Sequence, residues 1–240
     1  MLSRFMGILI VNEGADGSGK ETQTTLLCER LKSEGYRVER FDFPTYGRDP
    51  VADLIKSLLS TRQAHWNERT MESRALLYAA NRALFRDELR GFLETPGTIV
   101  VCNRYVASNQ AHMAGYLTNS NAWEERFAWI ERLEFEHIGL PRPDIVLFHT
   151  MPHAKRAALL EKREQGKQDA HERDAEYLQR VEQCYALLAR RHAAVWRHIP
   201  ADVHGRVEAP PDVHVRVWET LAAHPAWREF VQQRVRVGTP

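Results

Sequence analysis

The amino-acid sequence predicts an α/β fold, in which a parallel sheet of about five strands lies between two layers of helices. Short apolar segments bounded by turn residues alternate along the chain with longer segments of helical periodicity. The short segments are apolar at consecutive positions, which is typical of strands buried on both faces of a parallel sheet. Alternation of this kind indicates βαβ units. Since no internal repeat or long linker is present, we expect one domain over residues 1–240.

The predicted elements follow one another in a regular order. Strands are expected at residues 7–12, 38–43, 98–102, 144–148 and 195–199. The first helix is expected over residues 22–33, because Leu26, Leu27 and Leu31 recur at helical spacing and Gly35 follows as a C-cap. Further helices are expected at residues 51–59, 68–93, 121–137, 154–162 and 172–192. Residues 210–240 are expected to form a C-terminal helical extension.

Charge and composition exclude several classes of protein. Lys and Arg number 33 against 32 Asp and Glu, so no basic excess favours nucleic acid or an anionic membrane as a partner. The chain is 43% hydrophobic and 27% charged, which excludes a disordered or collagen-like polymer. Its three cysteines lie far apart, and the apolar run at residues 5–11 is too short to span a bilayer. We therefore expect a cytoplasmic protein that binds neither nucleic acid nor membrane.

The segment from residue 14 to residue 22 is the strongest functional signal. It directly follows the first predicted strand, and its glycines let successive backbone N–H groups turn toward phosphate oxygens. The following helix adds its positive N-terminus, and Lys20 adds a mobile charge. This pattern is typical of the phosphate-binding loop (P-loop) of nucleotide-binding proteins with three-layer folds, although a glycine-rich turn without a ligand is the alternative. The expected ATP-binding residues are Gly14, Ala15, Asp16, Gly17, Ser18, Gly19, Lys20, Glu21 and Thr22.

One position of the loop departs from the general P-loop pattern. GxxxxGK[ST] places a hydroxyl after the lysine, where this chain has Glu21, and Thr22 comes one residue later. That hydroxyl ordinarily binds Mg²⁺. The Glu21 carboxylate either replaces it or turns outward, away from the phosphates.

Several segments together resemble one family. Residues 12–23, NEGADGSGKETQ, resemble the EGxDGxGKxTQ loop of thymidylate kinases, which phosphorylate dTMP to dTDP with MgATP. Further segments resemble motifs of that family in the same order, namely FPTYG at 43–47, LYAANR at 77–82, NRYVASNQA at 103–111, GLPRPD at 139–144 and DAHERD at 169–174. The resemblance spans roughly residues 7–190. It implies a P-loop nucleoside monophosphate kinase that uses ATP, dTMP and Mg²⁺ and forms a homodimer.

The resemblance also implies the acceptor site. Tyr78 would stack on thymine and Arg82 would bond its carbonyl, and their i, i+4 spacing lets both reach one ligand. Arg104 follows a buried strand and would hold the acceptor phosphate, with Asn109 reaching the base. The alternatives are a core tyrosine, a solvated Arg82, and an Arg104 paired with a lid carboxylate. The expected acceptor-binding residues are Asp16, Phe43, Tyr46, Tyr78, Arg82, Arg104, Ser108, Asn109, His112 and Glu172.

Catalysis and metal binding are assigned in the same way. Asp16 and Glu172 are the expected carboxylates for magnesium or the acceptor sugar, although they suit an Asx turn and a helix N-terminus equally well. The polar segment 161–173 is expected to belong to a lid at about 160–173, with a solvated helix face as the alternative. One of its cations would meet the transferred charge. The expected catalytic residues are Asp16, Lys20, Arg104 and Arg163, with Lys162 and Lys167 as alternatives to the last.

Three positions differ from the family pattern and leave other functions open. Asn103 replaces the Asp of the DRY motif, His112 replaces a tyrosine beside the sugar, and Thr45 stands where a basic residue is frequent. A kinase for another nucleotide, or a nucleotide-binding protein with weak or lost catalysis, is therefore the alternative. Trp129, Leu133 and Phe135, on the part of the predicted helix from residue 123 to residue 137, form either a dimer face or part of the core.

Overall fold

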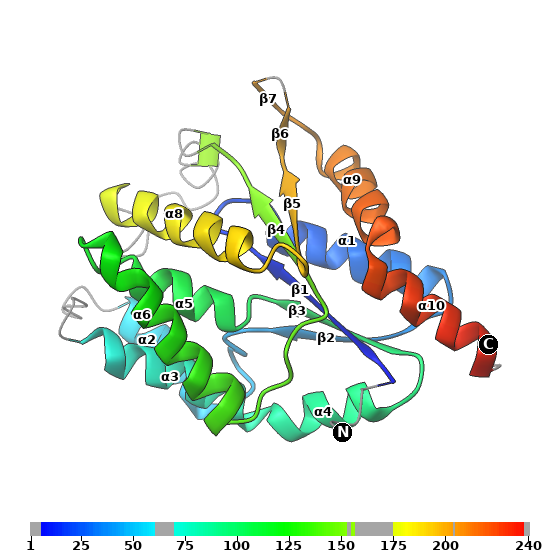
Figure 1. The fold of residues 1–240 in the computed structure, drawn as a ribbon, viewed down its shortest axis with the longest axis horizontal. Coiled ribbons are helices and arrows are strands. Elements are labelled where there is room, and N and C mark those ends of the chain that lie inside the picture. Colours follow the sequence, from blue (N-terminus) through cyan, green and yellow to red (C-terminus); the bar gives the residue numbers. More distant parts are fainter. Residues whose placement is uncertain (1–5, 61–69, 153–154, 157–174, 204, 238–240) are drawn as a thin grey trace.

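The computed structural model describes residues 6–60, 70–152, 155–156, 175–203 and 205–237. It confirms the α/β fold, because five strands form one parallel sheet in the order β2-β3-β1-β4-β5 (Figure 1). The strands are β1 Ile8–Glu13, β2 Arg37–Asp42, β3 Thr98–Asn103, β4 Ile145–Thr150 and β5 Trp196–Pro200. A two-stranded antiparallel hairpin follows them, β6 Asp202–Val203 with β7 Arg206–Val207.

The central strand β1 shows how the sequence builds two cores. Its side chains alternate between the faces of the sheet, so Ile8 and Ile10 join one buried cluster while Leu9 and Val11 join the other. Its last residues lie in register with those of β3, where Asn12 pairs with Asn103. The carboxyl ends of the two strands therefore open at the same sheet edge, where open α/β sheets bind ligands.

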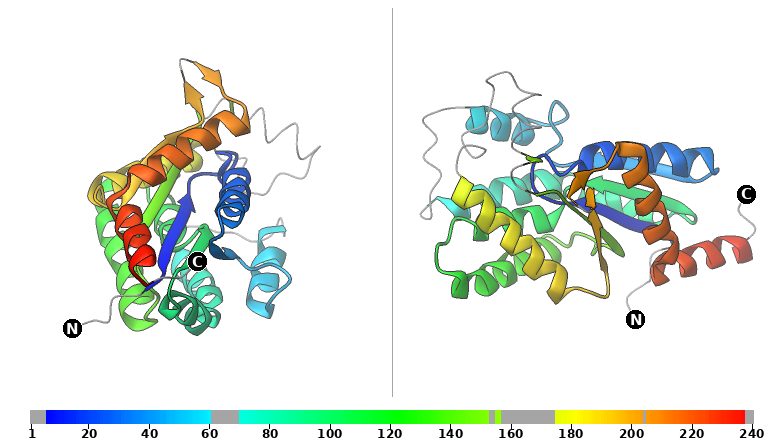
Figure 2. Two further views of the ribbon diagram at one scale, coloured as in Figure 1. Left: turned by 90° about the vertical axis from the view of Figure 1, so that its right-hand side faces the viewer. Right: turned by 90° about the horizontal axis from the view of Figure 1, so that it is seen from above.

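Helices cover both faces of the sheet. α1, α9 and α10 pack on one face, and α3, α4, α5, α6 and α8 pack on the other (Figures 1 and 2). The α-helices are α1 Lys20–Ser33, α2 Pro50–Ser60, α3 Met71–Leu84, α4 Arg86–Glu94, α5 Val106–Ala114, α6 Trp123–Glu131, α8 Ala175–Arg191, α9 Pro210–Ala223 and α10 Pro225–Val237. In the part of the chain that is described, no helix is both long and apolar enough to cross a membrane.

The single helix predicted over residues 68–93 was wrong. The described part of this segment forms two helices, α3 and α4, which meet at Phe85. The Phe85 N–H donates to Arg82 O three residues back, at 3.1 Å, which tightens the last turn. The Phe85 ring packs edge-on against Phe41 and Phe43, with centroids 6.1 and 6.2 Å away. Tertiary packing of this ring therefore overrides the helical periodicity of the sequence.

The helix predicted over residues 121–137 is not uniform either. It begins as a 3-10 turn, η1 Ser120–Ala122, capped by the Asn119 side chain. It continues as α6 and ends as a π-helix, η2 Arg132–His137. The wider turn ends with the Leu140 N–H donating to the Glu134 carbonyl oxygen at 3.0 Å. Glu134 is fully buried and lies on the same face of the helix as the buried Phe127 and Ile130.

The C-terminal helices form part of the core on the α1 side (Figure 2). Trp227 and Phe230 of α10 lie against Tyr36, with ring centroids 5.5 and 6.4 Å away. Arg30 of α1 stacks over the Trp218 ring of α9 at 3.8 Å. The apolar side chains of α9 and of the first part of α10 are therefore buried in the same core as those of α1, the helix that follows the phosphate-binding loop. The predicted lid, and most of the helix predicted at 154–162, lie outside the described residues.

Candidate functional site

The phosphate-binding loop, residues 14–20, runs from the end of β1 into α1. Gly14 has φ 147°, and a Cβ atom there would lie 2.4 Å from the His149 carbonyl oxygen, so only glycine fits. Gly19, with φ 85°, is the N-cap of α1. Of the N–H groups of residues 15–19, only that of Ser18 donates a hydrogen bond within the described part of the chain. The remaining N–H groups and the helix N-terminus are available to an anion.

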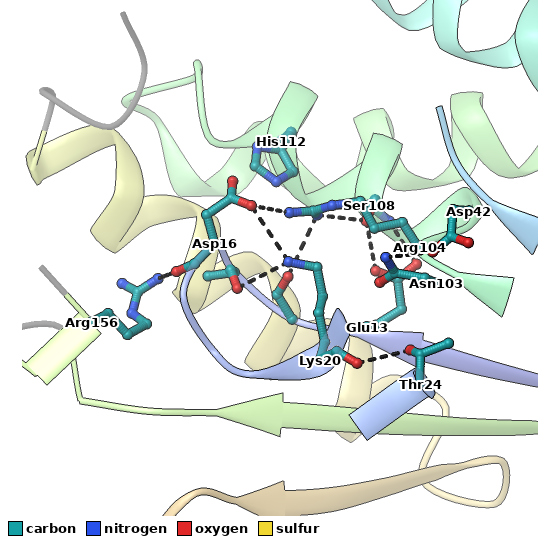
Figure 3. Close-up of polar contacts among 12 residues, drawn as sticks. Glu13, Asp16, Lys20, Thr24, Asp42, Asn103, Arg104, Ser108, His112 and Arg156 are labelled. Carbon is teal, nitrogen blue, oxygen red and sulfur yellow. Dashed lines mark hydrogen bonds and ion pairs between the residues drawn. The ribbon is translucent and has the colours of Figure 1, made fainter. Parts of the chain in front are cut away.

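Lys20 lies inside this loop and is only 6% exposed. Its Nζ lies 3.3 Å from the Ala15 carbonyl oxygen and 3.4 Å from Asp16 Oδ1 (Figure 3). Burial and the nearby Arg104 lower the pKa of Lys20 to about 8, against the opposing effect of Asp16. Burial alone would raise the pKa of Asp16, but Arg104 and Lys20 hold it well below its usual range. The site therefore presents a carboxylate between two cations.

Arg104 reaches the same carboxylate from the end of β3. Its φ of 65° is rare for a residue with a side chain, and its N–H donates to the Asn12 carbonyl oxygen at 2.9 Å. The guanidinium donates to Asp16 through Nη2 and to Ser108 Oγ through Nη1, the latter at 3.0 Å. The strained backbone therefore points the guanidinium at the phosphate-binding loop. Its partner is a carboxylate of that loop, and the predicted lid carboxylates lie outside the described residues.

Glu13 holds the segment that follows Arg104 and was not among the expected site residues. Its buried carboxylate accepts the N–H groups of Tyr105 and Ser108, at 2.8 and 3.1 Å, and thereby caps α5. It also accepts the hydroxyls of Ser108 and Tyr185, at 2.7 and 3.0 Å. The only signal in the sequence was a charged residue at the end of an apolar strand.

A cavity of about 600 Å³ adjoins the loop. It brings together each described residue expected at the acceptor site, from loop, strand ends and helices that are far apart in the sequence. Its lining consists of Asp16, Glu21, Arg40, Asp42, Phe43, Pro44, Tyr46, Leu59, Arg74, Tyr78, Arg82, Asn103, Arg104, Ser108, Asn109, His112, Met113 and Leu178. Glu172, Arg163 and the alternative lid cations Lys162 and Lys167 lie outside the described residues.

The two polar side chains expected to face a base, Arg82 and Asn109, both form hydrogen bonds with Glu134. Arg82 is 1% exposed and donates to both Glu134 oxygens, through Nε at 2.5 Å and Nη2 at 2.7 Å, so it is not a solvated surface charge. Burial disfavours the charged form of Arg82, but the facing carboxylate holds its pKa above the ordinary value. Asn109 Nδ2 donates to Glu134 Oε1 at 2.7 Å. Glu134 comes 52 residues after Arg82, and nothing in the sequence pattern pointed to this pair.

Tyr78 has a further partner that the sequence analysis missed. Arg74, one helical turn earlier on α3, is 4% exposed and donates to the Tyr78 hydroxyl at 3.3 Å and also to Tyr116. The contacts continue from Tyr116 to the Tyr177 ring, with centroids 4.7 Å apart, and from the Tyr177 hydroxyl to His112 Nδ1 at 3.0 Å. Tyr78 is partly exposed to the cavity, which favours the ligand-facing role over the core role.

The cavity offers carboxylates to a metal ion. Asp16 and Glu21 both line it, and Glu21 is exposed on the first turn of α1. Asp42 is engaged by Arg40, at 2.7 and 2.8 Å, and accepts Asn103 Nδ2 at 3.0 Å. No cluster of three metal-binding side chains occurs within the described ranges. One or two carboxylates with phosphate oxygens nevertheless suit Mg²⁺, so Asp16 and Glu21 fit such an ion.

A further cation contacts the phosphate-binding loop from the segment after β4. Arg156 is 2% exposed, donates through Nη1 to the Asp16 carbonyl oxygen at 3.0 Å and pairs with Glu182 of α8. The sequence analysis placed the lid cations later, at residues 162–167. Arg156 therefore fastens the segment after β4 to the phosphate-binding loop.

Comparison with known proteins gives a consistent family. A family model described as thymidylate kinase matches residues 12–203. The thymidylate kinase of Mycobacterium tuberculosis is 34% identical over 215 residues, covering 86% of this chain and 99% of the relative. That of Thermosynechococcus vestitus is 28% identical over 98% of this chain and 95% of its own length. The solved structure of a Candida albicans thymidylate kinase shares the fold, with a TM-score of 0.72 at 22% identity over 92% of this chain and 93% of that one. On these matches, and on the P-loop and cavity described above, the chain belongs to the thymidylate kinase family.

Proposed function

We infer that this protein transfers the γ-phosphoryl group of ATP to dTMP, which yields ADP and dTDP. The main support is the cavity itself, because it joins the phosphate-binding loop directly to the residues expected around the acceptor. Lys20, Asp16 and Arg104 lie where the two parts meet (Figure 3). A donor on the loop and an acceptor in the cavity would therefore meet at these charges.

The transfer requires positioning and charge neutralisation more than covalent chemistry. The free N–H groups of the loop and Lys20 hold the donor phosphates, and Arg104 holds the acceptor phosphate. Both cations exchange the Asp16 carboxylate for phosphate oxygens when the substrates bind. The acceptor is already an oxyanion, so no general base is needed.

Magnesium is the expected cofactor of this reaction, with Asp16 and Glu21 as the described carboxylates that would hold it. When bound, Mg²⁺ neutralises charge on the donor phosphates. Glu172 stays a predicted ligand and Arg163 a predicted catalytic cation.

The residues at the base end of the cavity suit a pyrimidine with an imide edge, in which an N–H donor lies next to a carbonyl acceptor. Tyr78 offers an aromatic face to the ring. Nη1 of Arg82 and Oδ1 of Asn109 make no hydrogen bond to the described residues, so one donor and one acceptor remain for the ligand. Thymine N3–H and O4 match that pair.

A panel of acceptors with MgATP tests this function. The kcat/KM measured for dTMP should exceed those for dCMP and AMP, and dTDP should appear in step with ADP. Turnover of dCMP or AMP far above dTMP would reassign the acceptor. ATP binding without transfer to any nucleotide would favour a protein that has lost catalysis.

We also propose a homodimer in the cytoplasm. The cytoplasm is proposed because the described cysteines are buried and unbonded, which suits a reducing compartment.

The dimer is proposed because Leu76, Ala80 and Leu84 form an exposed apolar stripe along one face of α3. Light scattering coupled to gel filtration should give a dimer mass for the wild type and a monomer mass for Leu84→Glu. A monomeric wild type would contradict the dimer.

A further inference from the structure

The carboxylate of Glu134 lies outside the expected set of site residues but contacts both side chains that face the base. It is fully buried and accepts hydrogen bonds from Arg82 and Asn109. We propose that Glu134 is a positioning residue that fixes the orientation of the Asn109 amide and thereby makes the site select thymine over cytosine. This inference rests on the proposed dTMP kinase function and assigns the origin of its base selectivity.

The neighbours of the Asn109 amide fix its orientation. The Asn109 amide nitrogen has two hydrogens, and both have acceptors: Glu134 Oε1 at 2.7 Å and the Ala75 carbonyl oxygen at 3.0 Å. A carboxylate and a carbonyl only accept. The NH₂ group must therefore face them, and the amide orientation follows from its neighbours.

The opposite orientation is strongly disfavoured. A flipped amide would place Asn109 Oδ1 against two oxygen acceptors, in a side chain that is only 3% exposed. In the observed orientation Oδ1 is buried and has no hydrogen-bond partner within the described residues. Asn109 lines the cavity, and we take its unpartnered Oδ1 as the acceptor that a base there would use, since in this orientation it is unable to become a donor.

Glu134 fixes the second group in the same way. Arg82 uses Nε and Nη2 on the carboxylate, which leaves Nη1 as the donor for the ligand. Glu134 Oε1 accepts from both Arg82 Nη2 and Asn109 Nδ2, so the two side chains are held side by side by one oxygen. The carboxylate thus sets one donor next to one acceptor.

This donor–acceptor pair distinguishes the two pyrimidines. Thymine offers N3–H as a donor and O4 as an acceptor, which complement Asn109 Oδ1 and Arg82 Nη1. Cytosine offers N3 as an acceptor and its amino group as a donor, so both contacts would be mismatched. An amide that could rotate would accept either base at this position. Selectivity therefore depends on the residue that prevents the rotation.

The local fold explains how a carboxylate reaches this place. Glu134 lies in η2 and continues the buried face of this helix, because Trp123, Phe127 and Ile130 precede it at spacings of three and four residues. Glu131, three residues earlier, instead reaches outward and accepts from Arg142 at 2.6 Å. The two glutamates on one continuous helix provide a matched pair for an experiment.

The test compares Glu134→Gln with Glu131→Gln as the control. A glutamine amide can donate to Asn109 Oδ1, which removes one of the two contacts that oppose the flip. The ratio of kcat/KM for dTMP to kcat/KM for dCMP should fall at least tenfold in Glu134→Gln, through a higher KM for dTMP and a lower KM for dCMP. In Glu131→Gln the ratio should stay within twofold of the wild type.

A second variant separates selectivity from stability, because Glu134→Gln also removes the charge partner of a buried guanidinium. Glu134→Asp keeps that charge and withdraws the carboxylate by one methylene, so its ratio should fall by less than in Glu134→Gln. Thermal melts establish that each variant is folded at the assay temperature. Folded variants that keep the wild-type ratio, or that lose both activities equally, would overturn the inference. A wild type that makes no dTDP would instead contradict the proposed function.

Discussion

The two ends of the cavity hold their cations differently. At the phosphate end, Lys20 and Arg104 share the Asp16 carboxylate, whose side chain is 40% exposed. At the base end, Arg82 pairs with Glu134, and the two side chains are 2% and 0% exposed. A solvent-accessible carboxylate is readily exchanged for a phosphate, whereas a buried bidentate pair persists. The phosphate end is therefore built to change partners, and the base end is built to keep its geometry.

The largest effect expected at the phosphate end is on the rate. Lys20→Ala should lower kcat/KM for dTMP by 10³ or more, about 4 kcal/mol of transition-state stabilisation, because the charge on the transferred group loses its cation. Steady-state kinetics measures this loss. Lys56→Ala, an exposed lysine of α2, is the control and should leave the rate unchanged. A loss below tenfold in Lys20→Ala would remove the lysine from catalysis.

The largest effect expected at the base end is on stability. Arg82→Met should lower the free energy of unfolding by about 3–5 kcal/mol, because it leaves the Glu134 charge buried without its partner. Adding Glu134→Met should restore most of that stability without restoring activity. Urea denaturation measures both effects.

Arg104→Met is the matched change at the phosphate end. Since its partner Asp16 is reached by solvent, this variant should lose about 1 kcal/mol or less. Equal losses in Arg82→Met and Arg104→Met would break the distinction between the two ends.

The pKa of Lys20, lowered to about 8 by burial and by Arg104, predicts a pH effect on donor binding. Above pH 8 the free protein loses the ammonium proton, so ATP affinity should fall by about tenfold for each further pH unit. Calorimetry at pH 9 in buffers of different ionisation enthalpy should show proton uptake on binding. Lys20→Met should show neither the slope nor the uptake, and a wild type without them would contradict the lowered pKa.

A further expected effect concerns His149, whose carbonyl oxygen lies against Gly14 of the phosphate-binding loop. Burial, and then Lys20, lower the pKa of His149 to about 3, so this histidine stays neutral in the folded state. As pH falls below about 6.5 the unfolded chain takes up a proton that the folded chain does not, and stability is lost at about 1.4 kcal/mol per pH unit. In His149→Gln this part of the acid sensitivity should disappear from denaturation curves measured between pH 7 and 5. An unchanged slope would mean that His149 is protonated in the folded protein, which would contradict its lowered pKa.

The sequence predicts the phosphate end of the cavity more fully than the base end. The phosphate-binding loop is contiguous, so glycine positions and Lys20 define it locally, and the five strands follow from apolar runs. Tyr78 and Arg82 were expected because residues 77–82 resemble a family motif, and their i, i+4 spacing on one helix is compatible with a shared ligand. Glu134 was not, since its role depends on a partner 52 residues away. The break at Phe85 was missed because aromatic packing, not periodicity, ends α3.

A crystal structure with dTMP and a non-hydrolysable ATP analogue tests the contrast between the two ends most directly. We predict that Lys20 Nζ and the Arg104 guanidinium leave Asp16 for phosphate oxygens, while Arg82 and Asn109 keep their contacts with Glu134 and bind the thymine edge. A complex in which the Glu134 contacts open, or in which the Asp16 contacts persist with the loop empty of phosphate, would contradict this account.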